Sequence, residues 1–391
     1  MFFLPRSRKH MTTDTIQNLD ANEIVFPKLG IDLHLSSTAF RIGNLSIQWY
    51  GILITLGLIL AMVYAFTQVK KYGLHPDRVL DAIIGGIIGA IVGARAYYVL
   101  LNWQDYAGDW KSILNLRGGG LAIYGGIIGG LLVGCLVAKL RKVKILPLLD
   151  IAGIGFLLGQ GIGRWGNFFN QEAFGCNTNS IFGMSGGKIQ EWITYSYPNT
   201  TFYQNFGTVL DASQPVHPCF LYESLWCLLG FVLLAIFAKK IRRYDGQIFL
   251  IYIGWYGLER AFVEGLRTDS LVIGNIRVSQ MLAILCVVAS VVLQIVFGAK
   301  VKRMGTDYKM YKDTAESKAM LAQLDADAQT EAPASTTDVT AEAETSDSDN
   351  HNTDSEADTD QAEGKTDDAE AAEKEDSSQA HAEEEKEEEK E

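Results

Sequence analysis

Apolar runs close to the length of a membrane-spanning helix recur along the first three quarters of the chain, separated by short polar segments. A helix needs about 20 mostly apolar residues to cross the hydrocarbon core of a bilayer. Seven runs have this character: Leu45–Val69, Val79–Leu101, Leu121–Leu140, Ile145–Gly163, Pro218–Ala238, Gln247–Gly265 and Val278–Phe297. The pattern therefore predicts an all-α fold, a polytopic membrane protein with about seven transmembrane helices.

Charge divides the chain further. Of 46 acidic and 34 basic residues, 28 acidic and 6 basic ones lie in residues 312–391, which contain no aromatic residue. Such a stretch buries too little apolar surface to offset its chain entropy, so we expect a disordered acidic tail. Three regions follow: an N-terminal segment at 1–44, a seven-helix membrane domain at 45–300 and the tail at 301–391. A single soluble globular domain is excluded.

Lysine and arginine gather in alternate loops, which sets the expected orientation. These loops follow the first, third, fifth and seventh runs, at Lys70/Lys71/Arg78, Arg141/Lys142/Lys144, Lys239/Lys240/Arg242/Arg243 and Lys300/Lys302/Arg303. Basic loops stay in the cytoplasm, so we expect a multi-pass protein of the cell membrane with its N-terminus outside and its C-terminus inside. The N-terminal segment is also basic, but a long segment translocates regardless of charge. Its sequence does not predict a secretory signal peptide.

Glycines recur at intervals of four in the second and third runs, at Gly85/Gly89/Gly93 and Gly126/Gly130/Gly134. Small residues at this spacing let two membrane helices pack closely. A shaped cavity for lipid is the alternative interpretation.

Ionisable and hydroxyl side chains from several runs are expected at one depth. Arg164 lies 19 residues beyond Ile145, which at 1.5 Å per residue places it about 28 Å from the cytoplasmic end, at the outer surface. The same counting places a set of residues from other runs at outer depth: Tyr50, Tyr124, His217, Glu223, Glu259, Arg260 and Glu264. A ring of interfacial anchors would explain tyrosines but explains a clustered Arg–Glu set less well.

Two segments combine these side chains where helices leave the membrane. Gly163–Gly175 (GRWGNFFNQEAFG) places a cation, carboxamides and a carboxylate between glycines. Farther along, Arg260, Glu264 and Arg267 share one helical face at i, i+4 and i+7. An arginine fork held in place by a glutamate suits a phosphate. A purely structural Arg–Glu pair is the alternative for the second segment.

The first of these segments resembles, at every fixed position, the signature of the prolipoprotein diacylglyceryl transferase family, Gly-Arg-x-Gly-Asn-Phe-x-Asn-x-Glu-x-x-Gly. The resemblance extends over about residues 40–300, through further motifs at Ile47–Gly51, Ala122–Gly126, His217–Pro218, Leu221–Glu223 and the Arg260/Glu264 face. It implies transfer of the diacylglyceryl group of phosphatidylglycerol to the lipobox cysteine of a prolipoprotein signal peptide. A thioether forms and glycerol phosphate leaves. The expected partners are these two substrates and membrane lipid in a bacterial cell membrane, with no cofactor, metal or nucleic acid.

The resemblance also implies site residues. Arg164 is expected to bind the lipid phosphate, and Arg260 to act at the reacting head group. Tyr50 and Glu264 complete the expected catalytic set together with Tyr124. The expected substrate-binding residues are Asn167, Asn170, Glu172, Gly175, His217, Tyr256 and Arg267.

Tyr124 departs from the commoner family pattern, which has histidine before the two glycines. A free tyrosine, with a pKa near 10, is a poor base at neutral pH, so the acceptor of the thiol proton stays open.

Two other classes are less well supported. An anion transporter should place charge at the bilayer midplane, and a lipid-binding scaffold would not explain the Asn/Glu signature. Three further questions stay open from the sequence: whether Cys176 and Cys219 pair, how the chain oligomerises, and whether the tail is solvated filler or docks a basic partner.

Overall fold

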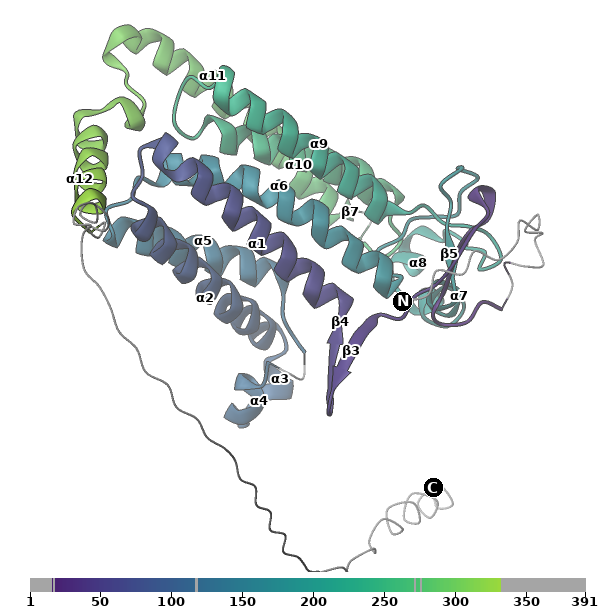
Figure 1. Ribbon diagram of the computed structural model, residues 1–391. Coiled ribbons are helices and arrows are strands. Elements are labelled where there is room, and N and C mark those ends of the chain that lie inside the picture. The colour runs from purple at the N-terminus through teal and green to yellow at the C-terminus, as the bar shows by residue number, and fades with distance from the viewer. Residues whose placement is uncertain (1–15, 17, 117–118, 271, 275, 332–391) are drawn as a thin grey trace, which may run out of the picture. The chain divides into compact units, whose positions relative to one another are not determined.

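All seven predicted spans are helices in the computed structural model, which describes residues 16, 18–116, 119–270, 272–274 and 276–331 (Figure 1). The helices are α1 (Trp49–Val69), α2 (Pro76–Leu101), α5 (Ile123–Leu140), α6 (Ile145–Asn170), α9 (Cys219–Lys240), α10 (Gln247–Leu266) and α11 (Val278–Met304). The predicted membrane bundle is thus confirmed. Residues 1–15 of the N-terminal segment and 332–391 of the tail lie outside the described residues.

Helix α10 differs from the other six in composition. Those six are long and apolar enough to cross a membrane. Helix α10 has 20 residues, but every stretch long enough to span includes Glu259, Arg260 and Glu264. Charge inside a membrane helix is expensive and is usually functional, so this exception directs attention to α10.

The glycine stripes bring α2 and α5 into close contact. A Cβ built on Gly93 would lie 2.4 Å from the backbone oxygen of Gly125, and one on Gly129 would lie 2.2 Å from that of Gly89. Backbones this close exclude any side chain at these positions. The glycine spacing predicted close packing of these two helices, but on α5 the tightest contacts are at Gly125 and Gly129 rather than along the predicted stripe. Helix α6 packs against α1, α9 and α10, and α11 packs against α10.

Short strands and helices cover the end of the bundle where α6 and α10 finish; we call this region the cap. Its strands are β1 (Glu23–Phe26), β2 (Ile31–His34), β3 (Thr38–Ile42), β4 (Leu45–Gln48), β5 (Ser185–Gly186), β6 (Val272–Ile273) and β7 (Ile276–Arg277). They form an antiparallel sheet of order β2-β1-β5 and two hairpins, β3-β4 and β6-β7. Four short helices connect membrane helices along the chain: α3 (Trp103–Tyr106) and α4 (Trp110–Leu114) between α2 and α5, and α7 (Gly187–Glu191) and α8 (Thr201–Phe206) between α6 and α9. A buried apolar cluster that includes Ile24, Phe168 and Phe174 joins the sheet to the end of α6.

At the opposite end, residues 305–331 fold back onto the bundle; we call them the C-terminal clasp. Tyr311 donates its backbone N–H to Asp245 Oδ2 (2.7 Å), and the fully buried Ser317 donates its hydroxyl to the Gly73 carbonyl (2.9 Å). The predicted disorder from residue 312 is therefore wrong for Ala315–Glu331, which form helix α12. This segment is ordered because Tyr311, just before it, packs into a buried apolar cluster with Tyr72 and anchors it.

Candidate active site

One buried carboxylate organises the arginines. Glu223, on the second turn of α9, is 1% exposed and lies 2.6 Å from Arg164 Nε on α6 and 2.7 Å from Arg260 Nη1 on α10. Arg267 Nη1, just after α10, lies 3.9 Å from the same carboxylate. Two segments about 100 residues apart in the sequence, α6 and the end of α10, thus bring three cations to one anion on α9. A buried charge is retained only when it is paired, and Glu223 supplies the pairing.

Glu264 fixes Arg260 from the other side. It lies one turn beyond Arg260 on α10, is 2% exposed and forms an ion pair with Arg260 Nη2. Its backbone oxygen accepts a hydrogen bond from Arg277, the last residue of β7 directly before α11. Arg164 Nη2 is 3.5 Å from the Tyr256 hydroxyl on the same face of α10. Arg260 and Glu264 therefore form the predicted i, i+4 pair on one face of α10. These contacts hold the guanidinium groups of Arg164 and Arg260 in fixed orientations.

Gly166 explains where Tyr50 lies. A Cβ on Gly166 would come within 2.3 Å of the Tyr50 ring, so only glycine lets the ring at the start of α1 pack flat on α6. Tyr50 thus lies against the signature segment, beside the glycine two positions after Arg164.

A strained turn follows α6. Gln171 and Ala173 both have left-handed backbones, with φ of 56° and 57°, although neither is glycine. Such strain persists only where surrounding contacts enforce it. The Gln171 side chain is buried and spans the backbones of Ala21 and Lys188. The turn places Glu172, which accepts from Asn167 Nδ2 (2.8 Å) and Asn170 Nδ2 (3.2 Å).

Gly175, the last residue of the signature, lies against the segment just before α9 and the segment just after α10; we call this contact the crossing. Its N–H donates to the His217 carbonyl (2.9 Å), and it pairs with Arg267 in an antiparallel bridge. A Cβ there would lie 2.8 Å from His217 Cβ and 3.1 Å from Cys219 Sγ, which accounts for glycine. Through this crossing the signature fixes the start of α9 and the end of α10, and with them Glu223 and Arg267.

The His217 imidazole and two cysteine thiols lie beside this crossing. Burial lowers the pKa of the His217 imidazole, whose Nδ1 lies 3.2 Å from the Tyr222 hydroxyl. Cys176 and Cys219 are both free. No disulfide joins the two cysteines in the described part of the chain.

Tyr124, another predicted site residue, has its described contact elsewhere. It lies at the start of α5, and its hydroxyl is 3.3 Å from Ser279 Oγ at the start of α11. Among the described contacts it therefore joins two helices rather than meeting an arginine.

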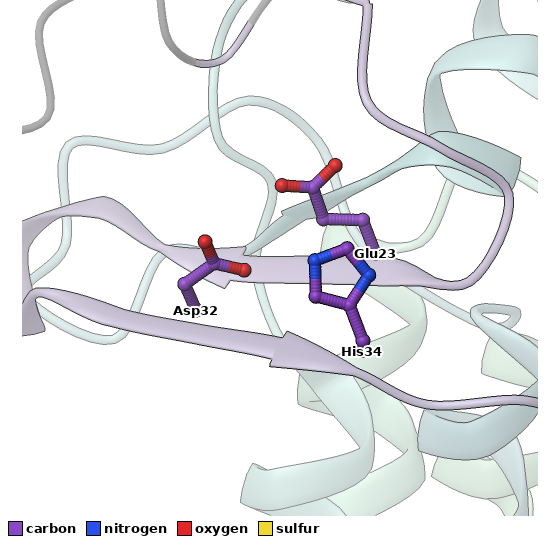
Figure 2. A group of neighbouring side chains, drawn as sticks. All are labelled: Glu23, Asp32 and His34. Carbon is purple, nitrogen blue, oxygen red and sulfur yellow. The ribbon is translucent and has the colours of Figure 1, made fainter. Parts of the chain in front are cut away.

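One group in the cap has donor atoms suited to a metal ion (Figure 2). Glu23 on β1 lies opposite His34 on β2, and Asp32 points to the same face, with the three ligand atoms within 4.8 Å of one another. Histidine nitrogen and carboxylate oxygen are ligands that zinc accepts. However, His34 is exposed and Glu23 already accepts from the Asp20 backbone. This group by itself does not define a metal site.

Fold and site together define a class: a polytopic membrane protein with three arginines gathered around a buried glutamate at one end of the bundle. Within that class, the family model described as prolipoprotein diacylglyceryl transferase matches residues 37–296. A relative from Finegoldia magna is 41% identical over 67% of this chain and 95% of its own length. One from Clostridium perfringens is 42% identical over 69% and 98%, and one from Bacillus cereus is 39% identical over 73% and 99%. The chain belongs to the prolipoprotein diacylglyceryl transferase family.

Glu223 is the residue to which the sequence assigned no site role. Its depth and its motif were recognised, but its partners lie on two other helices, and no spacing within α9 indicates them. Its polarity within an apolar run also marked it beforehand, but polarity does not indicate which cations it pairs with.

Proposed function

We propose that this chain transfers the diacylglyceryl group of phosphatidylglycerol to the cysteine thiol of a prolipoprotein, the first step of lipoprotein maturation. Its relatives are named phosphatidylglycerol–prolipoprotein diacylglyceryl transferases, and the chain covers almost their entire length. The observation that best supports this is the set of three arginines around Glu223. Those arginines suit a lipid phosphate at the end of a membrane bundle.

In the proposed reaction, the cysteine sulfur bonds to the carbon of the diacylglyceryl group that carries the phosphate. The bond between that carbon and the phosphate oxygen breaks, and glycerol phosphate leaves with the electron pair. The thiol proton passes to solvent or to Glu264. Arg164 and Arg260 stabilise the charge that develops on the leaving phosphate. Nearby guanidinium groups also favour the thiolate form of the incoming cysteine.

The surrounding residues position these groups. Glu223 and Glu264 hold the two guanidinium forks, and Tyr256 contacts Arg164 from α10. Asn167 and Asn170 orient Glu172 at the edge of the site. Gly175 and His217 hold the crossing that places Arg267. Tyr50 and Tyr124 offer hydroxyls toward the lipid head group.

We also propose the orientation in the membrane. The ends where α2, α6 and α10 begin are adjacent to the lysine- and arginine-rich loops, which the charge rule assigns to the cytoplasm. The cap and the arginines then face outward, and the lipid substrate is drawn from the outer leaflet. Its acyl chains remain among the helices or in the bilayer, and the lipobox cysteine of a membrane-embedded signal helix reaches the same level.

The test is a transfer assay. The full chain is reconstituted in phosphatidylglycerol vesicles with a lipobox peptide, and the peptide mass is followed. We expect a gain of one diacylglyceryl group on the wild-type peptide and none on a peptide with serine in place of the cysteine. An unchanged cysteine peptide would overturn the proposal.

A further inference from the structure

Glu259 is a buried carboxylate on α10 that has no part in the reaction as described so far. It is 4% exposed, and neither of its carboxylate oxygens has a hydrogen-bond partner among the described residues. Within the same part of the chain, none of the ion pairs at the arginines includes it. Buried polar atoms are almost always satisfied, so two unpartnered oxygens on one side chain require an explanation.

Glu259 lies among the charged groups of the site. Helices α6, α9 and α10 pack side by side there (Figure 1). The charged and titratable groups that interact electrostatically with Glu259 are Arg164 of α6, Glu223 and Cys227 of α9, Tyr256 and Arg260 of α10, and Arg267 just after α10. Helix α11 meets α10 at Gly257, two residues away and therefore on another face.

The ion pairs at the site balance without Glu259. Three arginines are paired with three carboxylates: Arg164, Arg260 and Arg267 with Glu223, Glu264 and Asp269. An ionised Glu259 would add a buried charge that no cation compensates and no donor solvates. Such a charge costs free energy that a neutral carboxyl group avoids.

A bound phosphate changes this balance. A phosphodiester carries one negative charge, and it would face the guanidinium groups of Arg164 and Arg260, beside which Glu259 lies. Two anions at close range repel each other strongly where little water separates them. A lipid phosphate and an ionised Glu259 therefore compete for the same cations, whereas a protonated Glu259 leaves the cations to the phosphate.

We propose that Glu259 sets the charge of the anion site: it is protonated while a lipid phosphate is bound, and its ionised form repels the phosphate. This rests on the proposed function, which supplies the anionic lipid. Because its oxygens are enclosed, Glu259 acts through the arginines and is a positioning residue. It takes one proton from solvent when the phosphate binds and returns it when glycerol phosphate leaves. Binding therefore weakens as pH rises through the range in which Glu259 ionises.

The experiment measures lipid binding without a peptide, so that no transfer takes place. The affinity of the full chain for phosphatidylglycerol and for diacylglycerol, which has no phosphate, is measured by thermophoresis in detergent from about pH 7 to 9. The phosphodiester keeps its single charge over this range, and His217, whose pKa is lowered by burial, stays neutral. Glu259→Gln keeps the shape but cannot ionise. Glu191→Gln, at an exposed position on α7, is the matched control.

We expect the affinity of wild type for phosphatidylglycerol to fall about tenfold over this range, since uptake of one proton changes affinity by at most about tenfold per pH unit. Glu259→Gln should keep the affinity that wild type has at pH 7, or a higher one, throughout, and Glu191→Gln should follow wild type. The affinity for diacylglycerol should not change with pH in any of the three proteins. A flat wild-type profile for phosphatidylglycerol, or the same slope in Glu259→Gln, overturns the role of Glu259 while the transferase function stands.

Two further measurements separate the remaining outcomes. If wild type binds phosphatidylglycerol but does not transfer it to a lipobox peptide, the proposed function fails, and the pH profiles of binding alone decide the role of Glu259. If Glu259→Gln does not fold, calorimetry of wild type in two buffers of different ionisation enthalpy replaces it. Uptake of a proton with phosphatidylglycerol and none with diacylglycerol supports the proposal, and no uptake with either lipid overturns it.

Discussion

At the scale of the residue, Glu223 sets the arrangement of the site. Its carboxylate is almost completely buried and accepts from two arginines, and each of those arginines has a further partner, Tyr256 or Glu264. Breaking one partner out of a buried ion pair costs about 3–5 kcal/mol, because the remaining charge is left uncompensated. The free protein therefore holds its guanidinium forks in place before lipid arrives. Such preorganisation is what stabilisation of a leaving phosphate requires.

We expect Arg164→Ala and Arg260→Ala each to lose roughly 3 kcal/mol or more of transition-state stabilisation, a hundredfold or more in rate. Lysine should restore little, because it lacks the fork that spans Glu223 and a phosphate. The measurement is the initial rate of peptide lipidation in phosphatidylglycerol vesicles. Near-wild-type turnover by either alanine variant would remove that arginine from the mechanism.

Glu223→Gln should impair both folding stability and activity. A glutamine keeps the shape but removes the charge that compensates Arg164 and Arg260, so we expect a loss of about 3 kcal/mol in stability. Thermal unfolding in detergent and lipidation rate are measured together. Glu191→Gln, at an exposed position on α7, is the matched control and should change neither. Unaltered unfolding of Glu223→Gln would show that the arginines do not depend on it.

Tyr124→Phe should lose one hydrogen bond, on the order of 1–2 kcal/mol, and hence about five- to thirtyfold in rate. Tyr124→His should stay active, because imidazole also donates. Ser279→Ala separates two causes, since Ser279 is the contact of the phenol in the free protein. An equal loss in Ser279→Ala would mean that the hydroxyl only joins α5 to α11. A basic limb in the pH–rate profile of wild type that is absent from Tyr124→Phe would instead show the phenol titrating.

The sequence indicated the candidate side chains individually but not the contacts between them. Arg260 and Glu264 could be paired beforehand because both lie on one helix, where spacing determines proximity. The contacts of Arg164 and Arg260 with Glu223 depend on how three helices pack, which no local pattern encodes. The strained backbone of Gln171 and Ala173 was likewise hidden, because neither residue type indicates a left-handed conformation.

At the scale of the element, α2 and α5 depend on the absence of side chains between them. Gly93 and Gly125 each sit against the other's backbone oxygen. The spacing of glycines predicted the close pair of helices. The facing partners were not predicted, because Gly125 and Gly129 meet α2 most closely although the predicted stripe runs through Gly126 and Gly130. Registry between two helices is a property of the pair.

Gly93→Leu should therefore prevent close packing of α2 on α5. No rotamer change can help, because the contact is with backbone, and we expect a destabilisation of at least about 3 kcal/mol or failure to fold. Gly298→Leu on α11 is the control, because nothing lies within 4 Å of a Cβ there. Thermal unfolding in detergent compares the two. Equal stability of both variants would show that the helices can separate without penalty.

At the scale of the molecule, the site and the C-terminal clasp occupy opposite ends of the same helices. The arginine group lies near the ends of α6 and α10, whereas the clasp contacts Gly73, Lys144 and Asp245 near the starts of α2, α6 and α10. The buried Tyr311 and Ser317 anchor the clasp to the bundle. The Lys70–Asp325 ion pair is largely exposed and contributes little to stability. The acidic composition alone predicted disorder here, because composition does not show that Tyr311 and Ser317 are buried. The clasp thus holds together three loops remote from the chemistry.

Truncation tests this division. A chain ending at Glu331 should unfold and lipidate like the full chain. A chain ending at Met304 should lose about 3–5 kcal/mol, from one buried aromatic side chain and the hydrogen bonds of Tyr311 and Ser317, and should melt roughly 10 °C lower. Its lipidation rate at 25 °C should remain near that of wild type, because the arginine group is unaltered.

Thermal unfolding in detergent and the peptide assay are run on the three chains in parallel. Equal melting of all three would mean that the clasp contributes nothing to stability. Loss of activity without loss of stability in the shortest chain would instead show that the clasp acts on the site across the length of the bundle.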